Sequence, residues 1–437
     1  MAVINLTTGD DTFPTLGTFP NLTAEPDIVN GLAGNDTITV GAGDQAFGNE
    51  GNDTLTATGD ATLYGGQGDD ELTSFAGGSS LLFGNLGIDN LTAAGNDTLY
   101  GGQGNDVLTA TGDYAAQLYG DAGDDNLIGN GDDTLYGGEG DDDLTGSGND
   151  LLFGNQGDDT LTAASTEEGS PTLYGGQGND ELTDTGSGAA ELYGNLGDDT
   201  LTGNGGDTLF GGQGSDILDA TGGGNVLYGN LGDDVLTTTT GGDTLYGGQG
   251  GDYLISNATL VAELDTDSLL FGNLGNDTLV GSAANDTLIG GAGVDVLTSG
   301  GGPTSFGYNA ITDGGDIITG FDGGEGGDII VLNPSAFTGL QFIEDNGLSS
   351  SDFVAAASLE AAILADTLPG GAASIYAISG GEGDIGQLYY DSTGGTTPED
   401  ATLIATFVDA GSFGSTDIFL GDPVSFDNPN NSLLVLG

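Results

Sequence analysis

The amino-acid sequence predicts an all-β protein whose chain winds into a solenoid of stacked coils, each with two strands. Three observations support this prediction: a loop pattern that recurs along most of the chain, a leucine or isoleucine at a fixed place after each loop, and 88 glycines among 437 residues. Self-similarity at a fixed period is typical of repeat architectures. Glycine permits the positive φ angles and the close backbone approach that stacked turns require.

The recurring loop has the form Gly-x-x-Gly-x-Asp-x-Leu and is read clearly from Gly48 to Leu55. Its aspartates mostly follow one another at 17 to 19 residues, with longer steps before Asp180 and Asp277. Each step corresponds to about two nine-residue units, so we interpret one step as one coil. The loop aspartates are Asp36, Asp53, Asp70, Asp89, Asp106, Asp125, Asp142, Asp159, Asp180, Asp199, Asp216, Asp234, Asp252, Asp277 and Asp295.

Between full loops lies a half-unit, such as residues 129–135 or 146–152, that keeps the strand pattern but usually lacks the paired glycines. Each coil therefore has a strong edge, formed by the full loop, and a weak edge, formed by the half-unit. Acidic residues at the weak edge are sparser. Most of them precede a coil whose loop begins with Gly-Gly, and Asp44 and Asp150 are exceptions. The other weak-edge aspartates are Asp97, Asp133, Asp207, Asp243 and Asp286.

The three residues after each loop predict a short strand, in which side chains alternate between two faces. The middle leucine points inward and stacks on the leucines of adjacent coils, beginning with Leu55, Leu72, Leu91 and Leu108. We therefore expect a narrow apolar core with both flanking residues outside.

Composition limits the partners and the chemistry. The chain has 68 acidic residues, no Lys, Arg or His and a formal net charge of −68. Like charges in a compact state repel one another, and bound divalent cations relieve that repulsion. Nucleic acids and anionic membrane surfaces are poor partners, and no apolar run is long enough to insert into a membrane.

The same absences argue against an enzyme. Ser-His-Asp and Cys-His sites, Schiff-base lysines, histidine-ligated zinc and arginine phosphate clamps all need residues that this chain lacks. A pair of carboxylates acting on glycosides is the alternative that composition leaves open.

The nonapeptide Gly65-Gly-Gln-Gly-Asp-Asp70-Glu-Leu72-Thr73 and a second copy over residues 323–331 carry a family resemblance. They resemble the RTX family of hemolysin-type calcium-binding repeats, and the resemblance covers residues 27–332. It implies a right-handed parallel β-roll, here of about 17 coils, with many Ca²⁺ ions as cofactors. It also implies that loop carbonyls and loop aspartates, Asp328 included, hold Ca²⁺ between neighbouring coils. A hard cation prefers such oxygen ligands.

Three patterns lie within the repeat. The residue after the first loop glycine alternates, as in Asn49, Gly66, Asn85 and Gly102, so the true period is two coils. We interpret this as one continuous calcium column and a second, sparser one; duplication history without sparse occupancy is the alternative.

An aromatic residue precedes each full loop, outside the core, and we favour stacking along the axis over lateral packing in an assembly. The aromatic residues are Phe47, Tyr64, Phe83, Tyr100, Tyr119, Tyr136, Phe153, Tyr174, Tyr193, Phe210, Tyr228, Tyr246 and Phe271.

A threonine column follows the other strand, from Thr56 and Thr73 to Thr237. Regular threonines on a β-solenoid are also found on ice-binding surfaces, but the position two residues earlier varies here. Ordinary β-propensity on a solvated face is the favoured explanation.

The ends differ in composition from the repeats. We predict an N-terminal cap over residues 1–26, the calcium-binding roll over 27–332, and a β-rich C-terminal cap and type I secretion domain over 333–437. The cap is expected to contain one helix over 352–365 and strands over 374–378, 387–390, 401–408 and 417–420. The apolar tail over 432–437 and the lack of an N-terminal leader pattern predict export by type I secretion without a signal peptide.

In character the chain resembles the RTX coat and fibril proteins of filamentous cyanobacteria. This implies a secreted, extracellular or cell-surface structural protein that folds on Ca²⁺ and self-assembles into filaments or a surface layer. Its expected partners are copies of itself, with a cell-surface polysaccharide as a further candidate. The alternative is a monomeric calcium-dependent adhesin or a glycan- or ice-binding module.

Overall fold

The computed structural model describes residues 3–13, 26–75, 78–112, 114–166, 169–256, 267–322, 327–338, 353–356, 374–378, 386–392, 401–408 and 418–420. The chain divides into two compact units, residues 1–210 and residues 211–437. Both are built almost entirely of strands, and the fold class is a parallel β-solenoid, with about 15 turns in the chain, slightly fewer than predicted. The predicted division at residues 26 and 332 stays a prediction.

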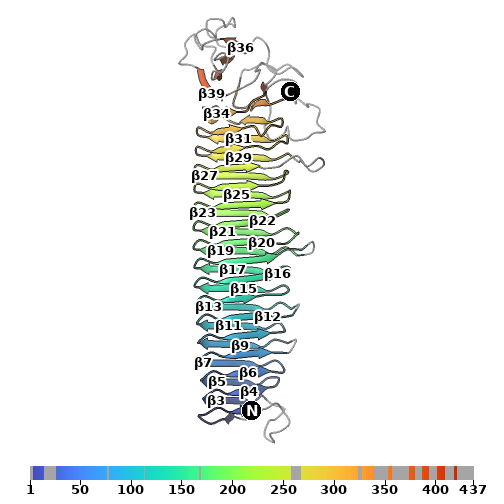
Figure 1. Cartoon of the computed structure of the whole chain (residues 1–437), viewed down its shortest axis with the longest axis vertical. Helices are drawn as coiled ribbons and strands as arrows, with labels where there is room; N and C mark the ends of the chain where they lie inside the picture. Colours follow the sequence, from blue (N-terminus) through green and yellow to red (C-terminus); the bar gives the residue numbers. More distant parts are fainter. Residues whose placement is uncertain are drawn as a thin grey trace. The chain divides into compact units, whose positions relative to one another are not determined.

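In the first unit, each turn contributes one strand to each of two parallel sheets, which we call sheet A and sheet B (Figure 1). Sheet A contains β1 (Val3–Asn5), β3 (Ile28–Ala33), β5 (Gln45–Glu50), β7 (Thr62–Gln67), β9 (Leu81–Leu86), β11 (Thr98–Gln103), β13 (Gln117–Ala122), β15 (Thr134–Glu139), β17 (Leu151–Gln156), β19 (Thr172–Gln177) and β21 (Glu191–Leu196). Sheet B contains β2 (Thr12–Phe13), β4 (Thr37–Val40), β6 (Thr54–Ala57), β8 (Glu71–Ser74), β10 (Asn90–Ala93), β12 (Val107–Ala110), β14 (Asn126–Ile128), β16 (Asp143–Ser147), β18 (Thr160–Ala164), β20 (Glu181–Asp184) and β22 (Thr200–Asn204). The strand β23 (Thr208–Gln213) spans the boundary of the units.

The second unit repeats this arrangement. Sheet A contains β25 (Val226–Leu231), β27 (Thr244–Gln249), β29 (Leu269–Leu274), β31 (Thr287–Ala292), β33 (Ser305–Tyr308) and β35 (Ile329–Leu332). Sheet B contains β24 (Ile217–Thr221), β26 (Val235–Thr238), β28 (Tyr253–Ser256), β30 (Thr278–Val280), β32 (Val296–Thr298) and β34 (Asp316–Thr319). A short 3₁₀ helix, η1 (Ile311–Asp313), precedes β34.

The core consists of the leucines that the repeat predicts. Leu55 pairs in register with Leu72, and Leu91 pairs with Leu108, so identical residues stack from turn to turn. These side chains have no exposed surface, whereas their strand neighbours are partly or fully exposed. The predicted apolar core is therefore confirmed. Alternation along each strand also buries the residue two places after the leucine, such as Ala57 in β6 and Ser74 in β8.

The aromatic ladder is confirmed in both units. In the first unit the rings from Phe47 to Phe210 stack with centroids 4.6 to 5.0 Å apart and planes within 11° of parallel. In the second unit Tyr228, Tyr246 and Phe271 stack at 4.9 Å. Each ring covers the face of the next, so the ladder presents ring edges outward.

The C-terminal strands continue the sheets of the second unit. The strand β40 (Ile418–Leu420) pairs with β35, and β39 (Ala401–Val408) pairs with β34. Two antiparallel strands, β38 (Gly386–Asp391) and β37 (Ser374–Ile378), extend sheet B beyond β39. The predicted strands of the cap are thus confirmed.

The predicted helix over 352–365 is wrong where the structure describes it. Residues Phe353–Ala356 form a strand, β36, that pairs in parallel with β37. Backbone hydrogen bonding to a neighbouring strand outweighs the local helix propensity of an alanine-rich segment. Residues 352 and 357–365 lie outside the described residues.

Candidate calcium sites

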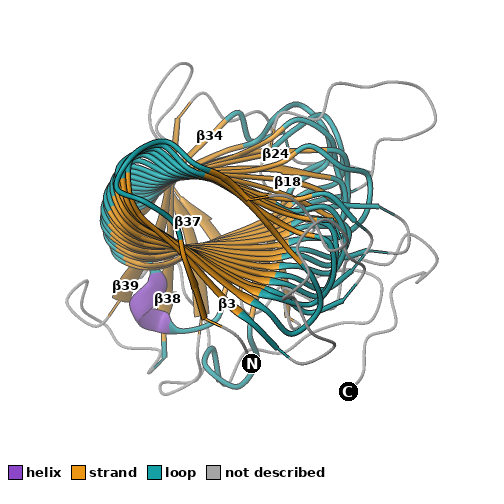
Figure 2. Ribbon diagram, turned by 90° about the horizontal axis from the view of Figure 1, so that it is seen from below, coloured by secondary structure: helices purple, strands orange, loops and turns teal. Residues whose placement is uncertain are grey.

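The strong edge connects each strand of sheet A to the following strand of sheet B. Its core residues are always nine positions apart, as in Leu63 and Leu72 or Leu245 and Leu254, up to Leu297. The weak edge makes the return connection and varies in length: Leu91 and Leu99 are eight positions apart, whereas Leu161 and Leu173 are twelve apart. Viewed along the axis, one edge is uniform and the other carries loops of different reach (Figure 2).

At the strong edge, the loop aspartates form a column of buried carboxylates within each unit. Every predicted loop aspartate is at most 3% exposed. One oxygen of each carboxylate accepts a hydrogen bond from the backbone N–H of the aspartate one turn before it. Asp36 N–H donates to Asp53 Oδ1 at 2.7 Å, and Asp89 N–H donates to Asp106 Oδ1 at 2.7 Å. In the second unit, Asp234 N–H donates to Asp252 Oδ1 at 3.0 Å.

The second oxygen of the strong-edge carboxylates is buried and has no hydrogen-bond partner within the described residues. A buried polar atom left unpaired costs free energy, so a repeated one indicates a missing ligand. The aspartates with such an Oδ2 atom are Asp36, Asp53, Asp70, Asp89, Asp106, Asp125, Asp142, Asp159 and Asp180 in the first unit, and Asp234, Asp252, Asp277 and Asp295 in the second.

Most of these oxygens face a carbonyl of the next turn across a loop glycine. A methyl group placed on Gly48 would lie 2.6 Å from the carbonyl oxygen of Gly65 and closer still to Asp53 Oδ2. The same cradle recurs at Gly229, between Asp234 Oδ2 and the carbonyl of Gly247. Because glycine leaves this space empty, a carboxylate oxygen and a carbonyl oxygen converge on one point between adjacent turns.

These donors fit Ca²⁺, which prefers carboxylate and carbonyl oxygens. Among the described residues, no three acidic side chains gather at one place, so backbone oxygens must complete any such site. The chain also offers no Lys, Arg or His as a counter-charge.

Burial raises the pKa of the strong-edge carboxyls. The pKa of Asp70 and of Asp89 rises to about 7, and that of Asp142 rises to about 8. Desolvation is the largest cause in each case, and neighbouring carboxylates raise the pKa further, while the backbone hydrogen bond from the preceding aspartate lowers it. The ionised column is therefore unfavourable without a cation beside it.

The weak-edge aspartates are also buried, and in five of them a backbone N–H donates to Oδ2, whereas Asp97 Oδ2 and Asp243 Oδ2 are buried without a hydrogen-bond partner among the described residues. Asp133 Oδ2 accepts from Asn130 N–H at 2.7 Å, and Asp150 Oδ2 accepts from Ser147 N–H at 2.7 Å. Similar local bonds reach the Oδ2 atoms of Asp44, Asp207 and Asp286. Each of these carboxylates accepts from a backbone N–H three or four residues earlier and so closes the turn that precedes it.

Two acidic residues, Asp316 and Asp184, occupy positions that the sequence prediction did not assign, and the predicted loop aspartate Asp328 lies on the other edge. Asp316 accepts from Asp295 N–H at 3.0 Å and so extends the strong-edge column; its signal was present, with Gly314 two residues before it and Ile318 two after. Asp328 accepts from Thr304 N–H and precedes a strand of sheet A, which places it on the weak edge. Asp184 points into the core side of β20 and carries no loop signature.

No helix among the described residues is long and apolar enough to cross a membrane. Among curated proteins, no sequence matches the chain.

The repeats match the protein family described as RTX calcium-binding nonapeptide repeat (4 copies). The matched residues are 23–55, 42–72, 56–78, 83–113, 111–144, 144–165, 168–183, 184–218, 193–227, 202–236, 228–258 and 271–303. RTX nonapeptide repeats bind multiple Ca²⁺ ions, are typically exported by type I secretion, and form a fold that is typically structural. The matches cover more than half of the sequence, so the chain belongs to the RTX calcium-binding repeat family.

Proposed function

We propose that the chain is a secreted structural protein that folds on Ca²⁺ and self-assembles into extracellular filaments or a surface layer. The observation that carries this proposal is the strong-edge column of buried, unpaired carboxylate oxygens in a chain without basic residues. Such a column needs cations from the surroundings before its turns can close. Extracellular calcium is millimolar, which is enough to fill sites with dissociation constants of about 10⁻⁴ to 10⁻³ M.

In this proposal, each ion lies between adjacent turns of the strong edge. Asp53 Oδ2 and the carbonyl of Gly65 are one pair of ligands, and the same pair of positions repeats along the column. The bound cation neutralises carboxylates whose pKa burial has raised, and it replaces the counter-charges that the polypeptide lacks. The weak edge depends less on metal, because backbone N–H groups already satisfy most of its carboxylates, although Asp97 and Asp243 keep an unpaired Oδ2 atom.

We infer a structural role because the acidic side chains of the column take part in closing the turns. A glycosidase needs two carboxylates facing each other across the substrate, whereas here the carboxylates of the column each face backbone. The solenoid offers long, regular surfaces, which suit assembly.

A glycan-binding module is less well supported. Aromatic rings bind sugars through their faces, and the ladder rings of this chain already cover one another at about 4.9 Å. On sheet B, Thr56 pairs with Thr73, but the neighbouring positions are Thr54 and Glu71, so the flat double row of an ice-binding surface is not continued.

Calcium titration followed by imaging tests the proposal. Circular dichroism of the full chain should show little β signal in EGTA and a strong one in millimolar Ca²⁺, reversibly. Light scattering and electron microscopy of the calcium-loaded sample should then show filaments or sheets. A β signal that survives exhaustive chelation would contradict folding on calcium, and a calcium-loaded protein that stays monomeric would contradict self-assembly.

A further inference from the structure

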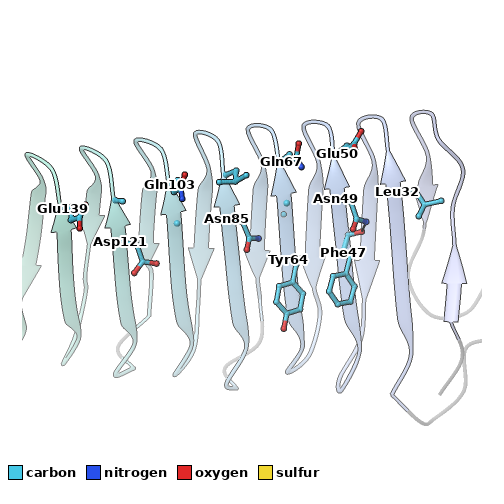
Figure 3. A pocket seen from close by; sticks show the side chains of 15 residues that line it. Leu32, Phe47, Asn49, Glu50, Tyr64, Gln67, Asn85, Gln103, Asp121 and Glu139 are labelled. Carbon is cyan, nitrogen blue, oxygen red and sulfur yellow. Dashed lines mark hydrogen bonds between the residues drawn. The ribbon is translucent and has the colours of Figure 1, made fainter.

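A groove runs across successive turns on the outer face of sheet A, beside the aromatic ladder. In the first unit it has a volume of about 1050 Å³. Figure 3 shows Asn49, Asn85 and Asp121 reaching across its floor, between the ladder and a row that includes Gln67 and Gln103. In the second unit the same positions of β25, β27 and β29 line a groove of about 540 Å³. The groove is thus a product of the repeat, formed independently in each unit.

Charge is unevenly distributed on this face: Glu50, Asp121 and Glu139 line the groove of the first unit, whereas the described groove of the second unit is lined by no acidic residue. The strands β9 and β11 of the first unit and β25, β27 and β29 of the second contain no acidic residue. Large apolar side chains are exposed instead: Leu86 is 43% exposed, Leu231 is 42% exposed and Leu274 is 53% exposed. Depletion of charge together with aromatic residues is typical of the core of a protein–protein interface.

The floor of the groove alternates between low and raised positions with a period of two turns. In one kind of turn, Gly66 or Gly102 leaves the floor bare, because a methyl group there would strike the backbone oxygen of Asn49 or Asn85. In the other kind, the asparagine crosses the floor and its Nδ2 donates to the carbonyl of the preceding aromatic residue, at 3.2 Å for Asn49. Notches over glycine therefore alternate with ridges made by asparagine and the exposed leucines.

The charge of the chain and the two-turn period of the groove together indicate which partner binds at the groove. Two copies of a chain with 68 acids and no bases repel each other except where neutral surfaces meet. The outer face of β25, β27 and β29 is such a surface, and a second copy brings ridges at the same two-turn spacing as the notches. Self-complementary contact of one patch with itself is the usual form of a two-fold interface.

We propose that two copies of this chain pack side by side through the outer face of sheet A, with exposed leucines of each copy seated over the glycine notches of the other. The inference rests on the proposed function, because it names the contact surface of the proposed assembly. It gives the exposed leucines and the neutral strands one common role.

Single cysteines in this cysteine-free chain provide the test. A nitroxide label is attached to Leu274→Cys on sheet A, and to Ile217→Cys as the control. Ile217 lies in the same unit, is 44% exposed and faces outward on sheet B. In millimolar Ca²⁺, we expect the label at position 274 to become immobilised with short distances between chains, while the label at position 217 stays mobile. Circular dichroism confirms that both variants fold on calcium.

A charge variant gives a second readout. Replacing Leu231→Asp and Leu274→Asp should raise the protein concentration needed for assembly by roughly tenfold or more, whereas Ile217→Asp should leave it within about twofold of the parent. Assembly in which position 217 is immobilised and position 274 is mobile overturns the proposed surface but leaves the proposed function standing. Absence of any calcium-dependent assembly overturns both. If position 274 becomes immobile only when dextran is added to monomeric protein, the occupant is a neutral polysaccharide and the proposal is wrong.

Discussion

The two edges of the solenoid have the same task, which is to turn the chain from one sheet to the other, but they solve it differently. The strong edge keeps nine positions between core leucines, whereas the weak edge ranges from eight, between Leu91 and Leu99, to sixteen, between Leu254 and Leu270. At the strong edge most carboxylate Oδ2 atoms lack a protein donor among the described residues, whereas at the weak edge a backbone N–H supplies one to most carboxylates, Asp97 and Asp243 excepted. An edge that must present oxygens to a cation tolerates no change in length, while an edge closed by its own hydrogen bonds does.

Insertion of one residue should give the largest difference in effect between the two edges. A glycine inserted after Asp233, in the strong edge, should displace Asp234 from its cradle and turn the side chains of β26 to the opposite face. We expect loss of calcium-induced β structure in the neighbouring turns, seen as a reduced amplitude in circular dichroism. A glycine inserted after Gly224, in the weak edge, should cost less than about 1 kcal/mol because it only lengthens an exposed loop. Equal losses from both insertions would contradict the difference between the edges.

Glycine replacements compare the steric limits of the edges. Gly102, at the strong edge, has φ of 115°, and a methyl group there would strike the backbone oxygen of Asn85. Gly206, at the weak edge, has φ of 90° but finds its nearest atom at 3.9 Å. Gly102→Ala should lower the free energy of unfolding by about 2–4 kcal/mol and Gly206→Ala by about 1 kcal/mol, from denaturant unfolding in calcium. The comparison fails if Gly206→Ala is the more damaging change.

Removing one charge from each edge tests which carboxylates bind metal. Asp106→Asn at the strong edge should raise the calcium midpoint of folding by roughly tenfold, because it removes an anionic ligand between Asp89 and Asp125. Asp133→Asn at the weak edge should shift the midpoint by less than about threefold, since the one amide oxygen still accepts from Asn130 N–H and, although the NH₂ group cannot accept from Ala116 N–H, no calcium ligand is lost. Calcium titration followed by circular dichroism measures both midpoints. A larger shift for Asp133→Asn would place the main calcium column on the weak edge.

Acidification should act in opposite directions on the metal-free and the calcium-loaded protein. In the metal-free fold, burial raises the pKa of Asp70 to about 7 and that of Asp142 to about 8, against about 4 in an unfolded chain. The resulting destabilisation is complete above about pH 8 and is relieved as the pH falls toward 4. Metal-free protein should therefore gain β signal between pH 8 and pH 4, while the calcium midpoint rises because protons compete for the same oxygens. A metal-free chain that loses structure on acidification would contradict this assignment.

The repeat could be predicted in detail because two strong local signals coincide in it. The loop glycines fix where each turn lies, and the leucine at the second place after each aspartate fixes which face is buried, so the core from Leu55 onward and the stacking of Phe47 on Tyr64 are confirmed. The family and its calcium binding follow from the same motif.

Other features depend on contacts that a motif does not encode. The edge to which Asp328 belongs is set by the sheet that its strand joins, and the strand over Phe353–Ala356 exists because β37 lies beside it. The alternation of glycine and asparagine has a steric reason, visible only when Gly66 is seen against the backbone of Asn49. The hydrogen bonds that satisfy the weak-edge carboxylates also required the structure.

The direction of the strong-edge hydrogen bonds gives each stack a chemical polarity. Every aspartate N–H donates forward along the chain, from Asp36 to Asp53 and from Asp53 to Asp70 in the first unit. A stack cut short at its N-terminal side would therefore end in a carboxylate oxygen that has lost its donor, and one cut short at its C-terminal side would end in an amide that has lost its acceptor. The first of these ends attracts cations and the second attracts anions, so fragments of equal length taken from the two sides would differ in what they bind.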